Sequence, residues 1–331
     1  MIRFNAKALA TTALVAVAVL GSASAASAAD KIVFRSADTH VADYPTVKAV
    51  EYMSEILAKE TNGRLSIKVF PASQLGEEKD TIEQTQLGVL DLNRVNLVPL
   101  NNIIPLTQVP SLPFLFTSVE HAQRVLDGPI GDEILASFAD KDLIGLAFYD
   151  SGARSFYNMK KPIHTPDDMK GMKIRVQQSD LMVGMVRALG ANATPMPFGE
   201  VYSGLQTGAI DGAENNWPSY YSTRHFEVAK YYSLTQHLMV PEALMMSKKT
   251  WDKLSKDDQK LVRDAAKKSA LKMHELWAAM EKVAHEAVTK GGSQINEVDK
   301  APFIKAMQPV YDQFVTDPKM KDMVARIRAT K

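Results

Sequence analysis

The amino-acid sequence predicts an α/β fold divided into two lobes, and three observations carry that prediction. Segments that alternate as β-strands do are followed by amphipathic helical segments in two successive series, a pattern typical of sheets with crossover helices. Roughly 300 residues follow the N-terminal segment, which is more than one hydrophobic core usually supports. A late helical pattern of about 33 residues would be about 50 Å long, which exceeds the diameter of a small domain, so we expect it to brace both lobes.

The first lobe is expected to cover residues 30–151 and to include about 240–281. Residues 65–69 alternate as in a half-buried strand, and Gly63 and Gly88 stand where helical patterns end. The expected elements are a strand at 31–37, a helix at 45–63, a strand at 64–70, a helix at 77–88, an extended segment at 91–100 and a strand at 143–150.

The second lobe is expected to cover residues 152–239 and to include about 282–331. The long helix has Ser255 as a capping residue and stops at Gly291 and Gly292. The expected elements are a strand at 172–176, helices at 179–190 and 199–208, a strand at 209–215, an extended run at 234–247 and the long helix from 255.

The N-terminal segment has the pattern of a secretory signal peptide over residues 1–28. Arg3 and Lys7 precede an apolar run at 8–20, and an Ala-x-Ala cleavage site follows. The run is shorter than the roughly 20 residues that a membrane-spanning helix needs. The sequence therefore predicts an exported protein with the signal peptide removed.

Composition and motifs argue against several functions. The chain has 39 Lys and Arg against 38 Asp and Glu, so loss of two basic residues with the signal peptide leaves a net charge of about −1, which argues against nucleic-acid binding. It has no cysteine, hence no disulfides or thiol chemistry. Hydrolase, P-loop and dinucleotide motifs are absent, and we expect no cofactor. His274 and His285 do not complete a metal motif, and both are expected to be solvated.

Two arginines fall near expected strand ends, where open α/β sheets place ligands. Arg175 is second from the end of the strand at 172–176, and Arg154 follows the strand at 143–150. Arginine is rarely buried unless paired, and its planar fork matches a carboxylate. The two arginines suggest a carboxylate pocket, although each could instead pair with an Asp or Glu of the protein.

Two sequence segments carry a resemblance to a known family. The stretch "GMKIRVQQSD", followed by "LGANATPMPFGEVYSGLQTGAIDGAENNWPSYY", resembles the extracytoplasmic solute-binding proteins of TRAP (tripartite ATP-independent periplasmic) transporters. The segments "FRSADTHVADYP", "FPASQLGEEKDTIEQTQLGVLDL" and "PSLPFLF" and the long helix extend the resemblance over the whole mature chain.

The resemblance implies a periplasmic flytrap with a hinge, which closes two lobes around an organic acid and delivers it to a TRAP membrane permease. It also implies that Arg175 holds the ligand's carboxylate in a paired contact, that Arg154 supports this contact and that Asn215 hydrogen-bonds the ligand. A protein of this kind is not an enzyme, and we expect it to be a monomer.

Further polar groups at expected strand ends predict the kind of acid. A polyhydroxylated ligand needs acceptor carboxylates such as Glu77 beside donor groups. The other candidates are His40, Arg94, Asn96 and, as a flat face for a sugar ring, Trp217. We therefore expect a hexuronate such as D-glucuronate or D-galacturonate.

Each of these candidates has a structural alternative. Glu77 begins a helix, where the dipole favours an acidic residue. His40 could satisfy loop backbone, and Trp217 could belong to the core. Arg94 and Asn96 share one strand face, and Asn93 lies on the other.

Other functions stay open at this stage. The ligand could be a C4-dicarboxylate or another organic acid. An exported lyase or hydrolase could use Glu77 and His40 as acid and base. The loaded protein could also signal to a membrane sensor.

Overall fold

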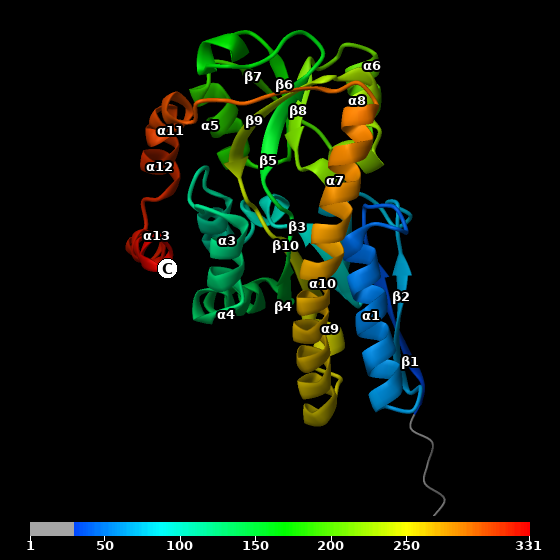
Figure 1. The fold of residues 1–331 in the computed structure, drawn as a ribbon. Coiled ribbons are helices and arrows are strands. Elements are labelled where there is room, and N and C mark those ends of the chain that lie inside the picture. Colours follow the sequence, from blue (N-terminus) through cyan, green and yellow to red (C-terminus); the bar gives the residue numbers. More distant parts are fainter. Residues whose placement is uncertain (1–29) are drawn as a thin grey trace, which may run out of the picture. The chain divides into compact units, whose positions relative to one another are not determined.

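The computed structural model describes residues 30–331, of which Lys31–Lys331 form one compact unit (Figure 1). The expected signal peptide, residues 1–28, lies outside the described residues. The compact unit contains two β-sheets, one above the other in Figure 1, and the helix α10 (Lys256–Lys290) runs beside both. Between residues 30 and 331, no helix has the length and apolar character needed to cross a membrane.

The first sheet combines N-terminal strands with one strand that returns late in the chain. Its order is β2-β1-β3-β10-β4, with β1 parallel to β2 and β3, and with β10 antiparallel to β3 and β4. Strand β10 therefore separates β3 from β4 and brings Glu242 opposite Asn96. The strands are β1 (Ile32–Ala37), β2 (Leu65–Phe70), β3 (Leu92–Asn96), β4 (Leu143–Tyr149) and β10 (Glu242–Ser247).

The second sheet has the order β11-β9-β5-β8-β6-β7. Strand β5 is antiparallel to β8 and β9, whereas β6 is parallel to β7 and β8. The extended run expected at 234–247 is in fact shared between β9 and β10, which belong to different sheets. The strands are β5 (Arg154–Asn158), β6 (Lys173–Val176), β7 (Asn192–Pro195), β8 (Gly212–Asn215), β9 (Tyr231–Leu238) and β11 (Gln294–Asn296).

Helices fill the connections and cover the sheets. The α-helices besides α10 are α1 (Pro45–Glu60), α2 (Glu78–Leu87), α3 (Val119–Leu126), α4 (Pro129–Ala136), α5 (Asp180–Ala188), α6 (Val201–Gln206), α7 (Trp217–Ser222), α8 (His225–Val228), α9 (Lys248–Trp251), α11 (Ala301–Ala306), α12 (Gln308–Phe314) and α13 (Pro318–Ala329). The 3-10 helices are η1 (Val98–Leu100), η2 (Pro105–Ser111), η3 (Ser137–Lys141), η4 (Pro166–Met169) and η5 (Phe198–Glu200).

The long helix braces both lobes, as its length predicts. Its Ser255 cap accepts a hydrogen bond from the backbone N–H of Asp258 at 3.1 Å, which satisfies one of the free N–H groups of the first turn. Met273 and Trp277 pack in the core of the first sheet, whereas Val288 packs in the core of the second. One helix thus contributes apolar side chains to both ends of the molecule.

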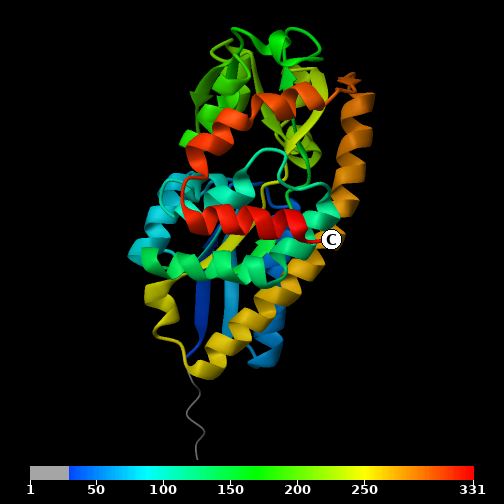
Figure 2. The same cartoon turned by 90° about the vertical axis from the view of Figure 1, so that its left-hand side faces the viewer.

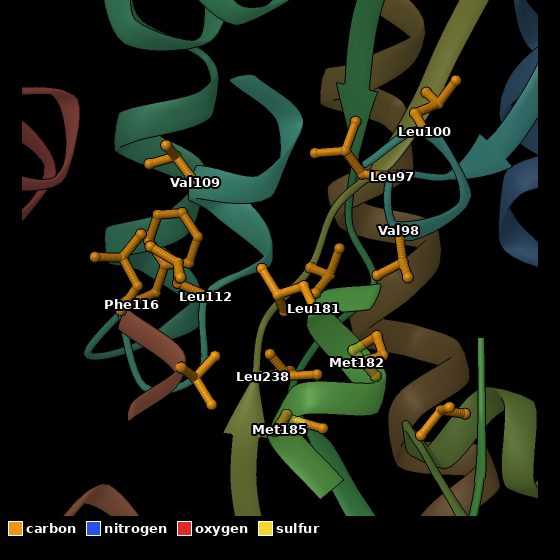
Figure 3. Packing of buried hydrophobic residues seen from close by; sticks show 14 of the residues in the cluster. Leu97, Val98, Leu100, Val109, Leu112, Phe116, Leu181, Met182, Met185 and Leu238 are labelled. Carbon is orange, nitrogen blue, oxygen red and sulfur yellow. The ribbon is translucent and has the colours of Figure 1, made fainter. Parts of the chain in front are cut away.

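A third apolar cluster joins the two lobes (Figure 3). Leu97, Leu112 and Phe116 come from the connections of the first sheet, and Leu181 and Met185 come from α5 beside the second. Because all of these side chains are buried in one cluster, the lobes share apolar surface on this side.

The C-terminal segment also runs between the lobes. Helices α11 and α12 lie near α5 and the second sheet, and α13 then lies against α3 and α4 (Figures 1 and 2). The Ile327 carbonyl is 2.9 Å from Nε2 of His121, and Arg326 pairs with Glu133 at 2.7 Å. Helix α13, which the sequence assigned to the second lobe, therefore contacts helices that connect strands of the first sheet. The exact lobe boundaries stay a prediction.

Candidate functional site

A polar cavity lies where the two lobes face each other. It holds about 280 Å³ of space not filled by protein, its open mouth included. Five of the eight predicted site residues line it, namely Arg175, Arg154, Asn215, His40 and Asn96. The remaining lining residues are Thr39, Glu78, Gln177, Phe198, Ser219 and Glu242. The cavity therefore takes side chains from both sheets and their connections.

Arg175 stands in this cavity wall as a buried cation without an anionic partner. Its side chain extends from β6 and only 2% of the residue is exposed. Nε and Nη2 both donate to the Met196 carbonyl, at 2.9 and 2.8 Å. No carboxylate oxygen of residues 30–331 comes within 4.0 Å of the guanidinium, and burial lowers its pKa. Three of its five N–H groups have no acceptor in this part of the chain.

Arg154 also lines the cavity, but the protein already balances its charge. It is the first residue of β5, a strand that the sequence patterns did not reveal. Nε and Nη2 donate to the two carboxylate oxygens of Glu214, at 2.6 and 2.8 Å. Burial alone would raise the pKa of Glu214, yet Arg154 holds it at about 2. Nη1 of Arg154 thus has no hydrogen-bond partner within residues 30–331, while the charge of Arg154 belongs to an internal ion pair.

Arg94 lies behind the cavity wall, which corrects the expectation that it faces the ligand. Its guanidinium is fully enclosed by carboxylates: Nε donates to Asp38 at 2.8 Å, Nη2 also contacts Asp38, and Nη1 donates to Glu242 at 2.7 Å. A buried charge needs such partners. Its role is to hold Glu242 and Asp38 in place, and it is not among the lining residues.

Two carboxylates form the wall of the cavity on the side of the first lobe, and the sequence analysis named neither. Glu78 accepts the backbone N–H of Asn96 at 2.7 Å, and Glu242 accepts Nδ2 of Asn96 at 3.0 Å. Burial, with a further contribution from Glu242, raises the pKa of Glu78 to about 7 even though Arg94 opposes the shift. These two acceptors and the Asn96 amide give the cavity a hydroxyl-binding character.

Glu77 lies outside the cavity lining, one residue before the carboxylate that the cavity uses. As the residue that precedes α2, its backbone N–H donates to Asp80 at 3.2 Å. Its side chain is 3.4 Å from the backbone N–H of Gly199. The helix-start alternative describes this residue better than the ligand role.

Trp217 is likewise absent from the cavity lining. Its ring stacks on Tyr232 with centroids 3.9 Å apart and an interplanar angle of 18°. It packs against the core of the second sheet. The structure therefore places Trp217 in the packing of the second sheet, as the structural alternative expects. This corrects the expectation that its ring offers a flat face to the ligand. Phe198, whose ring centroid is 6.0 Å from the Arg175 guanidinium carbon, is the aromatic residue of the lining.

The other lining residues are neutral and polar. Asn215 accepts the N–H of Asn216 at 2.9 Å through Oδ1, which leaves its Nδ2 to donate. His40 stacks on Tyr44 with ring centroids 3.6 Å apart, and burial lowers its pKa well below the usual value, so it is neutral. Gln177 has a buried Oε1 with no hydrogen-bond partner in the described residues. Unsatisfied groups of this kind suit a polar ligand.

A second hollow holds charged groups that pair with each other. A hollow of about 360 Å³ beside the crossover between β4 and β5 is lined by Asp127, Asp150 and His274, which form a closed ion cluster. Within residues 30–331, no group of three or more His, Asp or Glu side chains is placed to hold a metal ion. Within residues 30–331, the buried charged side chain that has no ionic partner is therefore Arg175, and it lies in the polar cavity.

Comparison with known proteins agrees with this geometry. The family model of bacterial extracellular solute-binding proteins, family 7, matches residues 36–317. A TRAP periplasmic solute-binding protein from Xanthobacter autotrophicus Py2, solved with bound β-D-galacturonate, is 60% identical, covers 90% of this chain and 100% of its own, and superposes with a TM-score of 0.89.

Two further relatives are more distant. A TRAP periplasmic solute-binding protein from Roseobacter denitrificans, solved with bound β-D-glucuronate, is 45% identical, with 91% of this chain and 100% of the other covered and a TM-score of 0.88. A solute-binding protein from Chromohalobacter salexigens is 44% identical over 318 residues, which are 95% of each chain.

Proposed function

Because this chain belongs to the bacterial extracellular solute-binding proteins of family 7, we propose that its polar cavity captures a hexuronate, D-galacturonate or D-glucuronate. The loaded protein would then deliver the acid to the membrane permease of a TRAP transporter. Solved relatives that are 60% and 45% identical carry β-D-galacturonate and β-D-glucuronate, which supports this choice of ligand.

The state of Arg175 is the observation that carries the proposal. A buried guanidinium without a carboxylate is costly, and the ligand's carboxylate would complete it. The three N–H groups left over after the Met196 contacts can provide a paired, charge-assisted contact. Asn215 and Nη1 of Arg154 stand in the same lining and would support it.

The carboxylates of the other wall support a sugar acid over a dicarboxylate. A sugar hydroxyl can donate to Glu78 or Glu242 and accept from an amide such as Asn96. The second carboxylate of a C4-dicarboxylate would instead stand close to two acidic side chains, where like charges repel. The ligand would therefore lie with its acidic group toward Arg175 and its hydroxyls toward the first lobe.

The proposal does not include catalysis. The acid and base that the sequence suggested were Glu77 and His40, and Glu77 is not part of the cavity lining. His40 is stacked on Tyr44 and neutral. The family and its relatives are solute-binding proteins of transporters. Export to the periplasm with loss of residues 1–28, and action as a monomer, complete the proposal.

Calorimetry on Arg175 variants tests this proposal. Arg175→Ala is expected to weaken binding of D-galacturonate and D-glucuronate by about 2 to 5 kcal/mol, because it removes the ligand's charge partner. Arg175→Lys is expected to be nearly as weak, because a lysine has no planar fork. Arg187→Ala, an exposed arginine in α5, is the matched control and should bind like the wild type. A dissociation constant within threefold of wild type for either Arg175 variant would remove Arg175 from the site.

A further inference from the structure

A hydroxyl pair joins the two lobes directly beside the cavity. Tyr44 precedes α1, which packs on the first sheet, and Ser219 lies in α7, which follows β8 of the second sheet. The Tyr44 hydroxyl and Ser219 Oγ are 2.8 Å apart, and each residue is only 1% exposed. Ser219 lines the cavity, whereas Tyr44 does not.

We propose that this pair is a closure contact that also turns the Ser219 hydroxyl into a hydrogen-bond donor for the bound acid. The inference rests on the proposed function, since it assigns a further ligand contact in the same cavity. Nothing in the sequence patterns singled out either residue. The roles of Tyr44 and Ser219 follow from the contacts of both side chains and from the number of protons that their two hydroxyls carry.

The proton count sets the direction of the hydrogen bond. The pair has two hydroxyl protons, and only one can lie between the two oxygens. If Ser219 donated to Tyr44, the Tyr44 proton would be buried without an acceptor, because no other hydrogen bond of this hydroxyl occurs in residues 30–331. Tyr44 therefore donates to Ser219, and the proton of Ser219 is left for an oxygen in the cavity.

Each hydroxyl is held in place by its own lobe. The Tyr44 ring stacks on His40 with centroids 3.6 Å apart and meets Trp277 of α10 edge-on at 6.1 Å. The backbone N–H of Ser219 donates to Oδ1 of Asn216 at 2.8 Å, which caps α7. Because the two partners are fixed from opposite sides, their hydrogen bond exists only when the lobes are together, and separation of the lobes breaks it.

The chain offers a matched control within one lobe. The Tyr149 hydroxyl is 2.7 Å from Ser269 Oγ, and this pair is also buried. It joins β4 to the part of α10 that packs on the first sheet. Removal of either hydroxyl deletes a Tyr–Ser hydrogen bond of the same chemistry, but the bond that is lost does not cross between the lobes.

Stopped-flow kinetics with D-galacturonate and D-glucuronate on the full mature protein tests the proposal. Tyr44→Phe should raise the dissociation rate constant by about 3- to 10-fold, the range for one net hydrogen bond, and leave the association rate constant within about twofold. Ser219→Ala should raise it further, because the ligand loses a donor as well. The double variant should dissociate no faster than Ser219→Ala, because Tyr44 acts through Ser219 and the double variant leaves no Tyr44 hydroxyl buried without an acceptor. Tyr149→Phe and Ser269→Ala should match the wild type.

Several results would overturn the proposal. An unchanged dissociation rate constant in Tyr44→Phe, additive effects in the double variant, or an equal effect in Tyr149→Phe would each show that Tyr44 and Ser219 do not form a closure contact. In those cases the wild type still binds the acids and the proposed function stands. Absence of any binding of either hexuronate by the wild-type protein would instead overturn both.

Discussion

The carboxylate of Glu78 is the side chain of the cavity wall from which we expect discrimination between a sugar acid and a dicarboxylate. It lies in the cavity wall, accepts the N–H of Asn96 and has a pKa of about 7 because of burial and of nearby Glu242. A carboxyl that is only partly ionised near neutral pH can hydrogen-bond a sugar hydroxyl either as acceptor or as donor. A second ligand carboxylate would gain much less from it.

Replacement of Glu78 tests this selectivity. Glu78→Gln keeps the shape of the side chain and removes its charge, so hexuronate affinity should fall by about 1.5 to 3 kcal/mol while affinity for succinate stays the same or rises. Calorimetry with both ligands measures the change. Glu77→Gln is the control, because the neighbouring carboxylate is not part of the lining. Equal behaviour of the two variants would contradict the assignment of Glu78.

For single residues, the sequence predicts which side chains reach the cavity better than it predicts which side chains form ion pairs with each other. Arg175 lines the cavity, as its place near a strand end predicts, and Asn215 lines it, as the family resemblance implies. Arg94 was also expected there, but Glu242, which binds it, is 148 residues away and enters the first sheet only through β10. Glu77 was chosen over Glu78 because a one-residue shift at the start of a helix cannot be read from periodicity.

Among the elements, α10 does more than pack on both sheets. His274, which was expected to be solvated, contacts Asp150 through Nδ1 at 2.8 Å and Asp127 through Nε2 at 3.1 Å. Asp150 follows β4 at the crossover to the second sheet, and Asp127 ends α3. The hydrogen bonds with Asp127 and then with Asp150 raise the pKa of His274 to about 10. An ion pair thus links α10 to the segment between β4 and β5, where the chain passes from the first sheet to the second.

The pH dependence of stability should report the ion pairs of His274 with Asp127 and Asp150. The pKa of His274 in the folded protein is above its ordinary value of 6.5, so its stabilisation is complete below pH 6.5 and is lost as the pH rises towards 10. His274→Gln should lower the free energy of unfolding by about 1.5 to 3 kcal/mol at pH 6, with the difference from wild type shrinking between those two values. Urea unfolding across this pH range measures it.

His285 on the same helix supplies the control for that experiment. It is exposed, forms no ion pair with another residue between 30 and 331, and its ring lies in a T-shaped arrangement with that of Trp217 at a centroid distance of 4.9 Å. His285→Gln should therefore leave the pH profile of unfolding unchanged. A loss of stability in His274→Gln that is the same at every pH would show that packing, and not charge, holds this region together.

The longest helix was predictable, whereas several of the short strands were not. The pattern from Ser255 onwards predicts α10 because many apolar positions repeat along it. Strands β5, β7 and β11 have three to five residues each, and so few positions show a period only weakly. The consequence for the site was direct, because Arg154 belongs to β5 and its pairing with Glu214 comes from the neighbouring strand β8.

For the molecule as a whole, capture of the correct acid should appear as resistance to heat. A ligand present at 100 times its dissociation constant adds about 2.7 kcal/mol to the stability of the protein that binds it. In a protein of about 300 residues, whose entropy of unfolding is about 0.6 kcal/mol/K, that corresponds to a rise in Tm of about 4 °C. D-galacturonate and D-glucuronate should produce this rise in a thermal-shift assay, and succinate should not.

The same assay separates the two classes of ligand. Arg175→Ala should lose the thermal shift with both hexuronates while its Tm without ligand stays close to that of the wild type, since the side chain has no internal ion pair to lose. A rise in Tm with succinate and none with the hexuronates would show that the cavity is built for C4-dicarboxylates.

The apolar cluster of Figure 3 limits how far this architecture can be taken apart. Leu97 and Phe116 belong to the same buried cluster as Leu181 and Met185, which lie in the other half of the chain. A chain cut at Gly152 would expose apolar side chains of this cluster on both fragments. Neither fragment is therefore expected to fold or stay in solution alone. Only co-expression of the two fragments is expected to restore the folded protein, because each fragment supplies part of the same apolar cluster.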